Sequence, residues 1–120
     1  MTNPNKAKGT RWESDVVKYL RAHDLPAVKP RQEGNEDVGD IHVGRFVLQC
    51  KDWKDVTAAT REGVEGAARQ SVVRANRAGT PWAWFPPVAV VKRARKGTGD
   101  GYVTMTLETF AVLAQDYLNP

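Results

Sequence analysis

The stretch of residues 37–51 constrains the fold most, because it has the alternating pattern of a β-hairpin. A glycine-containing pair, Gly44 and Arg45, separates two runs of alternating apolar residues, which is typical of a tight turn between antiparallel strands. Side chains alternate between the two faces of a strand. The second strand should therefore present Val47, Gln49 and Lys51 on one face and Phe46, Leu48 and Cys50 on the other.

A carboxylate, an amide oxygen and an amine should meet at one end of this hairpin. Asp40 leads into the first strand, and Gln49 and Lys51 close the second. Mg²⁺ prefers oxygen ligands, takes one or two carboxylates and leaves room for phosphate. A lysine beside such an ion would stabilise charge on a phosphate or help to orient and deprotonate a water molecule. The same residues also have a structural interpretation, in which Asp40 caps a strand and Lys51 is a solvated strand end.

The chain totals indicate a single folded domain. Its 120 residues are enough for one hydrophobic core. The lone cysteine, Cys50, excludes an intrachain disulfide framework and a multi-cysteine zinc site. There is no run of about 18 apolar residues, no signal-peptide pattern and no phosphate-binding glycine loop. We therefore expect a cytoplasmic protein with no membrane association and no organic cofactor.

The charge balance is compatible with nucleic-acid binding. The chain has 18 Lys and Arg against 14 Asp and Glu, a net charge of +4. Basic residues gather near the amino end and again at residues 92–96, and Arg31 precedes an acidic loop, where it would contact a phosphate or pair with Glu33 or Glu36. The candidate DNA-contacting residues are Lys6, Lys8, Arg11, Arg31, Lys92, Arg93, Arg95 and Lys96.

The amino-terminal third offers two interpretations of one acidic residue. We expect residues 1–8 to form a flexible basic arm, residues 9–120 to form the domain, and a helix to cover residues 11–23. Thr10 and Glu13 fit a capping box, in which Glu13 bonds back to the helix start. Glu13 also lies in line with the apolar positions Val16, Val17 and Leu20, so it would point toward the sheet and need a partner there. A metal ion shared with Asp40 would provide that partner, and this interpretation is favoured.

The remaining pattern alternates strands and helices. We expect strands at residues 27–31, 88–91 and 102–105, a helix from residue 56 or 57 to 78 that stops at Gly79, and a last helix capped by Thr106. The long helix should pack through a stripe of mostly small residues: Val64, Ala68, Ser71, Val72 and Ala75. Asp37 is a second-layer acid, an alternative ligand or a turn residue. Gln70 and Arg74 face the site or the solvent.

This order of elements, with Glu13, Asp40, Gln49 and Lys51, resembles the PD-(D/E)xK nuclease superfamily and, within it, the small Holliday junction resolvases of archaea and phages. The resemblance is carried by Lys8-Gly9-Thr10-Arg11-Trp12-Glu13, Gly39-Asp40-Ile41, Gln49-Cys50-Lys51 and Lys92-Arg93. It implies a restriction-endonuclease-like mixed sheet flanked by helices, in the order α-β-β-β-α-β-β-α. It also implies a homodimer that cuts branched DNA with Mg²⁺ or Mn²⁺, in the host cytoplasm if the protein is phage-encoded.

By matching position, the resemblance makes Glu13 and Asp40 metal ligands, Lys51 the catalytic lysine and the Cys50 backbone carbonyl a further ligand. Gln49 stands where the family usually has Glu or Asp and is a further catalytic-site metal ligand through its carbonyl oxygen. Because it carries no charge, the site loses one negative charge and should bind metal more weakly. Two alternatives stay open. One is a nuclease for flaps, forks, single-stranded DNA or RNA, and the other is a catalytically weak nucleic-acid-binding module.

Overall fold

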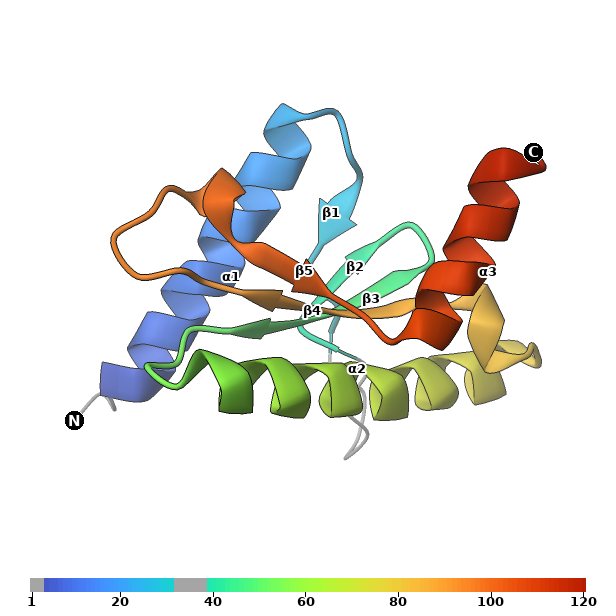
Figure 1. Cartoon of the computed structure of the whole chain (residues 1–120), viewed down its shortest axis with the longest axis horizontal. Coiled ribbons are helices and arrows are strands. Elements are labelled where there is room, and N and C mark those ends of the chain that lie inside the picture. The colour runs from blue at the N-terminus through green and yellow to red at the C-terminus, as the bar shows by residue number, and fades with distance from the viewer. Residues whose placement is uncertain (1–3, 32–38) are drawn as a thin grey trace.

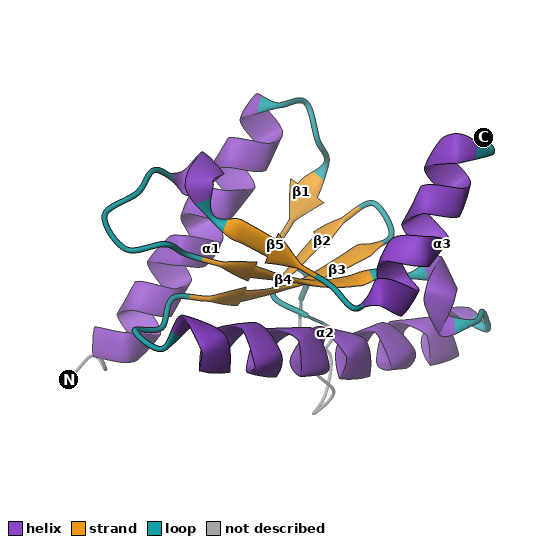
Figure 2. Cartoon of the chain, in the orientation of Figure 1, coloured by secondary structure: helices purple, strands orange, loops and turns teal. Residues whose placement is uncertain are grey.

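A five-stranded mixed sheet organises the computed structural model, which describes residues 4–31 and 39–120 (Figures 1 and 2). Its strands lie in the order β1-β2-β3-β4-β5, and three α-helices and two short 3₁₀ helices complete the described chain. The expected mixed α/β class is confirmed. The strands are β1 Ala27–Val28, β2 Ile41–Val43, β3 Phe46–Lys51, β4 Pro87–Val91 and β5 Tyr102–Thr104. The helices are α1 Pro4–Ala22, α2 Val56–Ala78, η1 Trp82–Trp84, η2 Thr98–Asp100 and α3 Leu107–Leu118.

The predicted hairpin is confirmed. Strands β2 and β3 pair antiparallel with Ile41 opposite Leu48, and the turn is made at Gly44, whose φ of 56° lies in the left-handed region that favours glycine. The two faces of β3 also separate as expected. Leu48 belongs to the core cluster beneath α1, whereas Val47 packs with Ala75 of α2 and with Phe85, the residue after η1.

Helix α2 covers one face of the sheet through its smallest residues. It connects β3 to the parallel strand β4, all five residues of which are buried. A Cβ added to Gly63 would lie 2.8 Å from the Cβ of Ala89, so helix and strand are in direct contact. Its ends match the sequence pattern: Asp55 caps the start, and Gly79 ends the helix with a φ of 70°.

The predicted packing face of α2 was partly wrong. Ser71 and Ala75 are buried as expected, but Val72 is 47% exposed. The buried face instead follows glycine and alanine, because the flat surface of β3 and β4 leaves no room for a larger side chain at the closest points. The buried residues of α2 are Ala59, Gly63, Gly66, Ala67, Gln70, Ser71 and Ala75.

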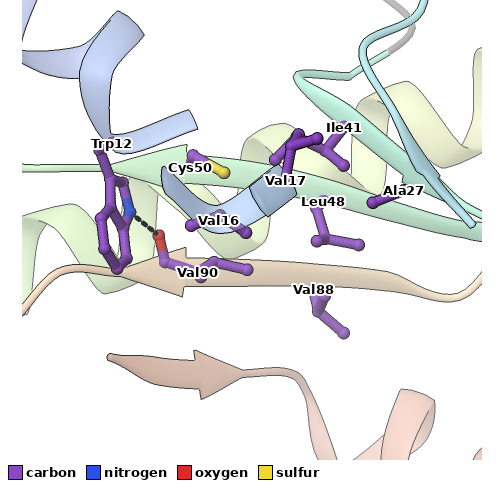
Figure 3. Close-up of a cluster of buried hydrophobic side chains, with 9 residues drawn as sticks. All are labelled: Trp12, Val16, Val17, Ala27, Ile41, Leu48, Cys50, Val88 and Val90. Carbon is purple, nitrogen blue, oxygen red and sulfur yellow. Dashed lines mark hydrogen bonds between the residues drawn. The ribbon is translucent and has the colours of Figure 1, made fainter. Parts of the chain in front are cut away.

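Helix α1 packs on the opposite face through Trp12, whose indole Nε1 donates a hydrogen bond to the Val90 carbonyl at 3.0 Å (Figure 3). The helix begins at Pro4 and not at residue 11, so it includes residues 4–8 of the proposed arm. The Thr10 hydroxyl donates to the Lys6 carbonyl at 3.0 Å, within the helix. The predicted capping box is therefore wrong, since Thr10 does not begin the helix.

Strand β5 and helix α3 form the exposed end of the molecule. Thr106 caps α3 by accepting a hydrogen bond from the Thr109 amide at 3.1 Å, as its position predicted. Thr109 is the one buried residue of the helix. In Figure 1, α3 lies at the end of the sheet away from the start of α1. No helix in the described ranges is long and apolar enough to cross a membrane.

Candidate functional site

Asp40 is held firmly at the start of β2. Its backbone amide donates to the Leu48 carbonyl at 3.0 Å, and its carboxylate Oδ2 accepts the Cys50 amide at 2.8 Å. The preceding Gly39 has a φ of 106°, and a Cβ there would lie 2.8 Å from Val47 Cγ1. Only glycine fits this approach without strain. The carboxylate is thus fixed beside the end of β3, and it has a structural as well as a potential chemical role.

The hairpin residues predicted to meet do meet, at one open cavity of about 600 Å³. Asp40 comes from the start of β2, and Gln49 and Lys51 come from the end of β3. Helix α1 contributes Lys8 to the wall. The other lining residues are Asn5, Gly9, Cys50, Asp52, Trp53 and Lys54.

Glu13 shares the electrostatic environment of this cavity, although it is not among the lining residues. Burial raises the pKa of its carboxyl, and the charge of Asp40 raises that pKa further. Lys29 and Lys51 act in the opposite direction. Glu13 therefore lies close enough to Asp40 and Lys51 for their charges to act on its proton. The charges of Asp40, Lys29 and Lys51 all act on the Glu13 carboxyl.

Gln49 has a buried polar atom that needs a partner. Its Oε1 is buried and makes no hydrogen bond with any described residue. Leaving such a group unsatisfied costs about 1–3 kcal/mol. Helix α2 lies directly behind the side chain, because a Cβ on Gly66 would be 3.6 Å from Gln49 Cγ. The amide is thus packed in place with its oxygen available to a ligand.

The donor set fits a hard cation. The described residues contain no group of three or more His, Cys, Asp and Glu side chains arranged to hold a metal. Of the candidate ligands, Glu13 and Asp40 would supply carboxylate oxygens, and the amide oxygen of Gln49 and the backbone carbonyl of Cys50 would add neutral oxygens. Burial, followed by the charges of Asp40 and Glu13, raises the pKa of the Cys50 thiol, so the sulfur stays protonated. An all-oxygen set suits Mg²⁺ or Mn²⁺ and not zinc.

Lys51 is positioned by two neighbours. Its Nζ lies 4.9 Å from the ring centroid of Trp53, within the range of a cation–π contact. Its aliphatic stem runs past α2, where a Cβ on Gly63 would lie 3.5 Å from Lys51 Cγ. Trp53 was missed in the sequence, although its place two residues after Lys51 in a polar segment was a usable signal.

Lys29 was also missed. Its Nζ donates to the Ser14 hydroxyl on α1 at 2.9 Å, and its charge lowers the pKa of Glu13. No local pattern identifies it, because its place beside α1 depends on the pairing of β1 with β2.

The other residues predicted near the site, Asp37, Gln70 and Arg74, have different outcomes. Asp37 lies outside the described residues. Gln70 is buried against the loop before Asp40, with its Oε1 3.5 Å from the position of a Cβ on Gly39, and it does not line the cavity. Arg74 donates to the Gly44 carbonyl at 3.0 Å and to the Phe46 carbonyl at 3.5 Å. The idea that Arg74 faces the site is wrong, since it holds the hairpin turn instead.

Two basic clusters that are far apart in sequence meet beside the site. Lys8 and Lys92 both approach Asp52, with Nζ to carboxylate distances of 3.5 and 3.9 Å. Arg11 lines a neighbouring cavity of about 320 Å³ with both lysines. We call Lys8, Arg11 and Lys92 the basic patch.

The other basic candidates lie elsewhere. Arg93 stacks over the Tyr102 ring at 4.8 Å from its centroid. Lys6 is exposed on α1, and neither it nor Arg93 lines the cavity. The remaining three, all exposed and away from the cavity lining, are Arg31, Arg95 and Lys96.

Fold and site together describe a mixed α/β protein with an oxygen-rich, lysine-containing cavity next to a basic patch. No protein-family model, no curated protein and no solved structure matches the chain. Any function must therefore be argued from the residues themselves.

Proposed function

We propose that the protein is a metal-dependent endonuclease of the restriction-endonuclease-like class that hydrolyses phosphodiester bonds in branched DNA, as a Holliday junction resolvase does. One observation carries the proposal. Asp40, Gln49 and Lys51 converge on one cavity, and the charges of Asp40 and Lys51 act on Glu13. The order of these residues in the chain is that of the PD-(D/E)xK nucleases.

The metal ligands in this proposal are the carboxylates of Glu13 and Asp40, Gln49 Oε1 and the Cys50 carbonyl. The unsatisfied Oε1 of Gln49 supports this assignment, because a cation would give it a partner. When bound, Mg²⁺ or Mn²⁺ would supply Lewis-acid activation of the attacking water and of the phosphate.

The chain's own residues would do the rest. Lys51 donates to a non-bridging phosphate oxygen and stabilises the charge that develops there. Trp53 restrains the Lys51 ammonium through the cation–π contact. The basic patch beside the cavity binds neighbouring phosphates and fixes the register of the strand. A homodimer would place two such sites for symmetric cutting of a junction.

One feature of the site favours a second candidate. Gln49 is neutral, so the site has two carboxylates where the family usually has three acids, and its attraction for a cation is lower. A module that binds nucleic acid with little or no cleavage is consistent with that loss. A nuclease with another substrate, such as a flap, a fork, single-stranded DNA or RNA, keeps the same chemistry.

A cleavage assay separates these functions. A synthetic four-way junction, a flap, a fork, a linear duplex, single-stranded DNA and RNA are compared in Mg²⁺, Mn²⁺ and EDTA. We expect ion-dependent cleavage of the junction and, in Lys51→Ala, a rate lower by about 100-fold or more. Lys18→Ala is the matched control, since Lys18 is an exposed lysine of α1 outside the cavity.

Each result has a defined meaning. Wild-type cleavage by Lys51→Ala contradicts the catalytic assignment. Salt-dependent binding without cleavage in either ion favours the binding module. Cleavage of flaps or RNA in preference to the junction keeps the metal site and changes the substrate.

A further inference from the structure

Trp53 is a large aromatic residue that the fold leaves open to solvent. It is 41% exposed, whereas Trp12 is 2% exposed and donates its indole hydrogen to the Val90 carbonyl. Aromatic rings usually contribute to stability by being buried. Trp53 belongs to none of the core clusters of the described residues, so what lies around its ring decides its role.

The segment that carries Trp53 is held at both ends. It is the connection between β3 and α2, which lies beside the start of α1 in Figure 1. On one side the Lys51 carbonyl accepts the Lys92 amide at 3.0 Å, and on the other the Asp55 carboxylate accepts the Ala58 amide at 3.0 Å. Because only residues 52–54 separate these two anchors, the ring is held near one place and loses little conformational entropy when a ligand binds.

Three lysines share a cavity with the exposed ring. Trp53 lines the cavity of about 600 Å³ together with Lys8, Lys51 and Lys54, and the Lys51 Nζ lies over the ring at 4.9 Å from its centroid. In the proposed function Lys51 contacts a phosphate, so the base of that nucleotide or of the next one lies within reach of the indole. Basic side chains for phosphates and exposed aromatic rings for bases are the two kinds of group by which proteins bind unpaired nucleic acid.

We propose that Trp53 stacks on a nucleobase, and that the cavity therefore takes an unpaired nucleotide of a DNA strand. A base inside a continuous duplex is covered by its neighbours, so its face cannot reach the ring. An unpaired base can reach it, and the contact needs no particular sequence because every base has a face to offer. The inference rests on the proposed function, which places a phosphate at Lys51, and deepens it, since it makes the substrate a strand that has left its duplex, as at a branch point.

Binding of DNA probes in EDTA tests the inference in the absence of cleavage. The probes are a single-stranded thymidine oligonucleotide, a sugar-phosphate strand of the same length without bases, and a linear duplex. The strand without bases keeps the phosphates and removes only the partner of the ring. We expect Trp53→Ala to weaken binding of the thymidine strand about tenfold and binding of the other two probes by less than about twofold. Trp53→Phe, which keeps an aromatic ring, should retain most of the affinity for the thymidine strand.

Trp84→Ala is the matched control. Trp84 is 50% exposed and also contacts a cation, with Arg45 Cζ 3.9 Å from the centroid of its ring. It lines a different cavity, which shares no described lining residue with the cavity of Trp53. Its removal should leave the affinity for all three probes unchanged.

An equal loss of affinity for all three probes in Trp53→Ala overturns the stacking role, because Trp53 would then act only through Lys51 or the local structure. An unchanged affinity for the thymidine strand overturns it as well, and so does a wild type that binds none of the probes. Circular dichroism checks that the variant is folded. If Trp53→Ala does not fold, Trp53→Leu, which keeps an apolar side chain without the aromatic ring, takes its place with the same expected outcome.

The cleavage assay judges the proposed function separately. A selective loss on the thymidine strand, in a protein that cleaves none of the substrates, supports stacking and contradicts the nuclease. Ion-dependent cleavage of the junction, together with equal losses on the three probes, supports the nuclease and contradicts stacking.

Discussion

Helices α2 and α3 differ in how much of their surface is buried against the rest of the chain. Helix α2 places Gly63, Gly66 and Ala67 against the sheet and so reaches the strands at contact distance. Helix α3 turns its largest apolar residues to solvent and buries only Thr109. The difference shows that the shape of the receiving surface decides which side of a helix is buried, and that apolar size alone does not.

The two halves of the molecule also differ in how closely they are packed. The half covered by α2 is closely packed, and it holds Gln49 and Lys51 in fixed positions. The half that ends in α3 exposes large apolar side chains, among them those of Leu107 and Tyr117. We expect substitutions in the first half to have the larger effects on chemistry and stability.

The largest effect is expected at Asp40. Asp40→Asn keeps an oxygen that can accept the Cys50 amide but removes the charge that would hold the cation. Ion-dependent cleavage should fall by about 100-fold or more while the melting temperature stays close to that of the wild type. Asp40→Ala should in addition lose about 1–3 kcal/mol of stability, because the amide loses its acceptor. A wild-type rate in Asp40→Asn would leave this residue with a structural role alone.

The next effect tests the packing of α2. Gly63→Ala places a Cβ 2.8 Å from that of Ala89, so the helix must move away from β4, at a cost of about 1–3 kcal/mol. Gly9→Ala is the matched control. Its Cβ would meet nothing within 4 Å, and alanine should stabilise α1 by about 0.5–1 kcal/mol. Urea denaturation measures both. Equal stability of Gly63→Ala and wild type would contradict the close approach.

A smaller effect is expected from restoring a charge at the site. Gln49→Glu should strengthen Mn²⁺ binding by about tenfold, or roughly 1.4 kcal/mol, because it adds a carboxylate to the cavity. In EDTA the same variant should melt earlier, since a further acid joins Glu13 and Asp40. The midpoint of thermal stabilisation against Mn²⁺ concentration gives the affinity, with Gln115→Glu as control. An unchanged midpoint would argue against a cation at Gln49.

The smallest effect concerns the pH dependence of stability. Burial, and then the charge of Asp40, raises the pKa of Glu13 in the folded protein. Between the ordinary and the raised pKa the folded state binds more protons than the unfolded state, so stability falls as pH rises through this window. Glu13→Gln removes that loss. Its melting temperature in EDTA should exceed the wild-type value slightly above the window and match it below.

Scanning fluorimetry across the pH range checks this shift. With Mn²⁺ present the order should reverse, because the ion stabilises the ionised wild-type carboxyl. If Glu13→Gln had the same pH profile as the wild type, the charge of Asp40 would not act on the Glu13 carboxyl.

Local patterns predicted the parts of the fold that local geometry decides. Alternation and a glycine turn gave the hairpin and the shared face of Gln49 and Lys51, and the caps Thr106 and Gly79 marked helix ends correctly. These features depend on neighbouring residues in the chain. The convergence of Asp40 with Gln49 followed from the hairpin alone.

Features that depend on distant partners were missed. Thr10 and Glu13 have capping-box spacing, yet they lie inside a helix that packs through Trp12. The position of Lys29 beside α1 and the meeting of Lys8 with Lys92 both arise from tertiary packing. The spacing of residues along the sequence does not predict such tertiary contacts.

Asp52 lies between Lys8 and Lys92, so its carboxylate competes with any anionic ligand for these two ammonium groups. Asp52 is largely buried and carries the charge that an incoming phosphodiester would bring to the same two ammonium groups. In the proposed function, a phosphodiester would have to displace this internal carboxylate before it contacted both ammonium groups. Binding through these two lysines alone would then be weak, and ligands that engage further groups in the neighbouring cavity would bind better.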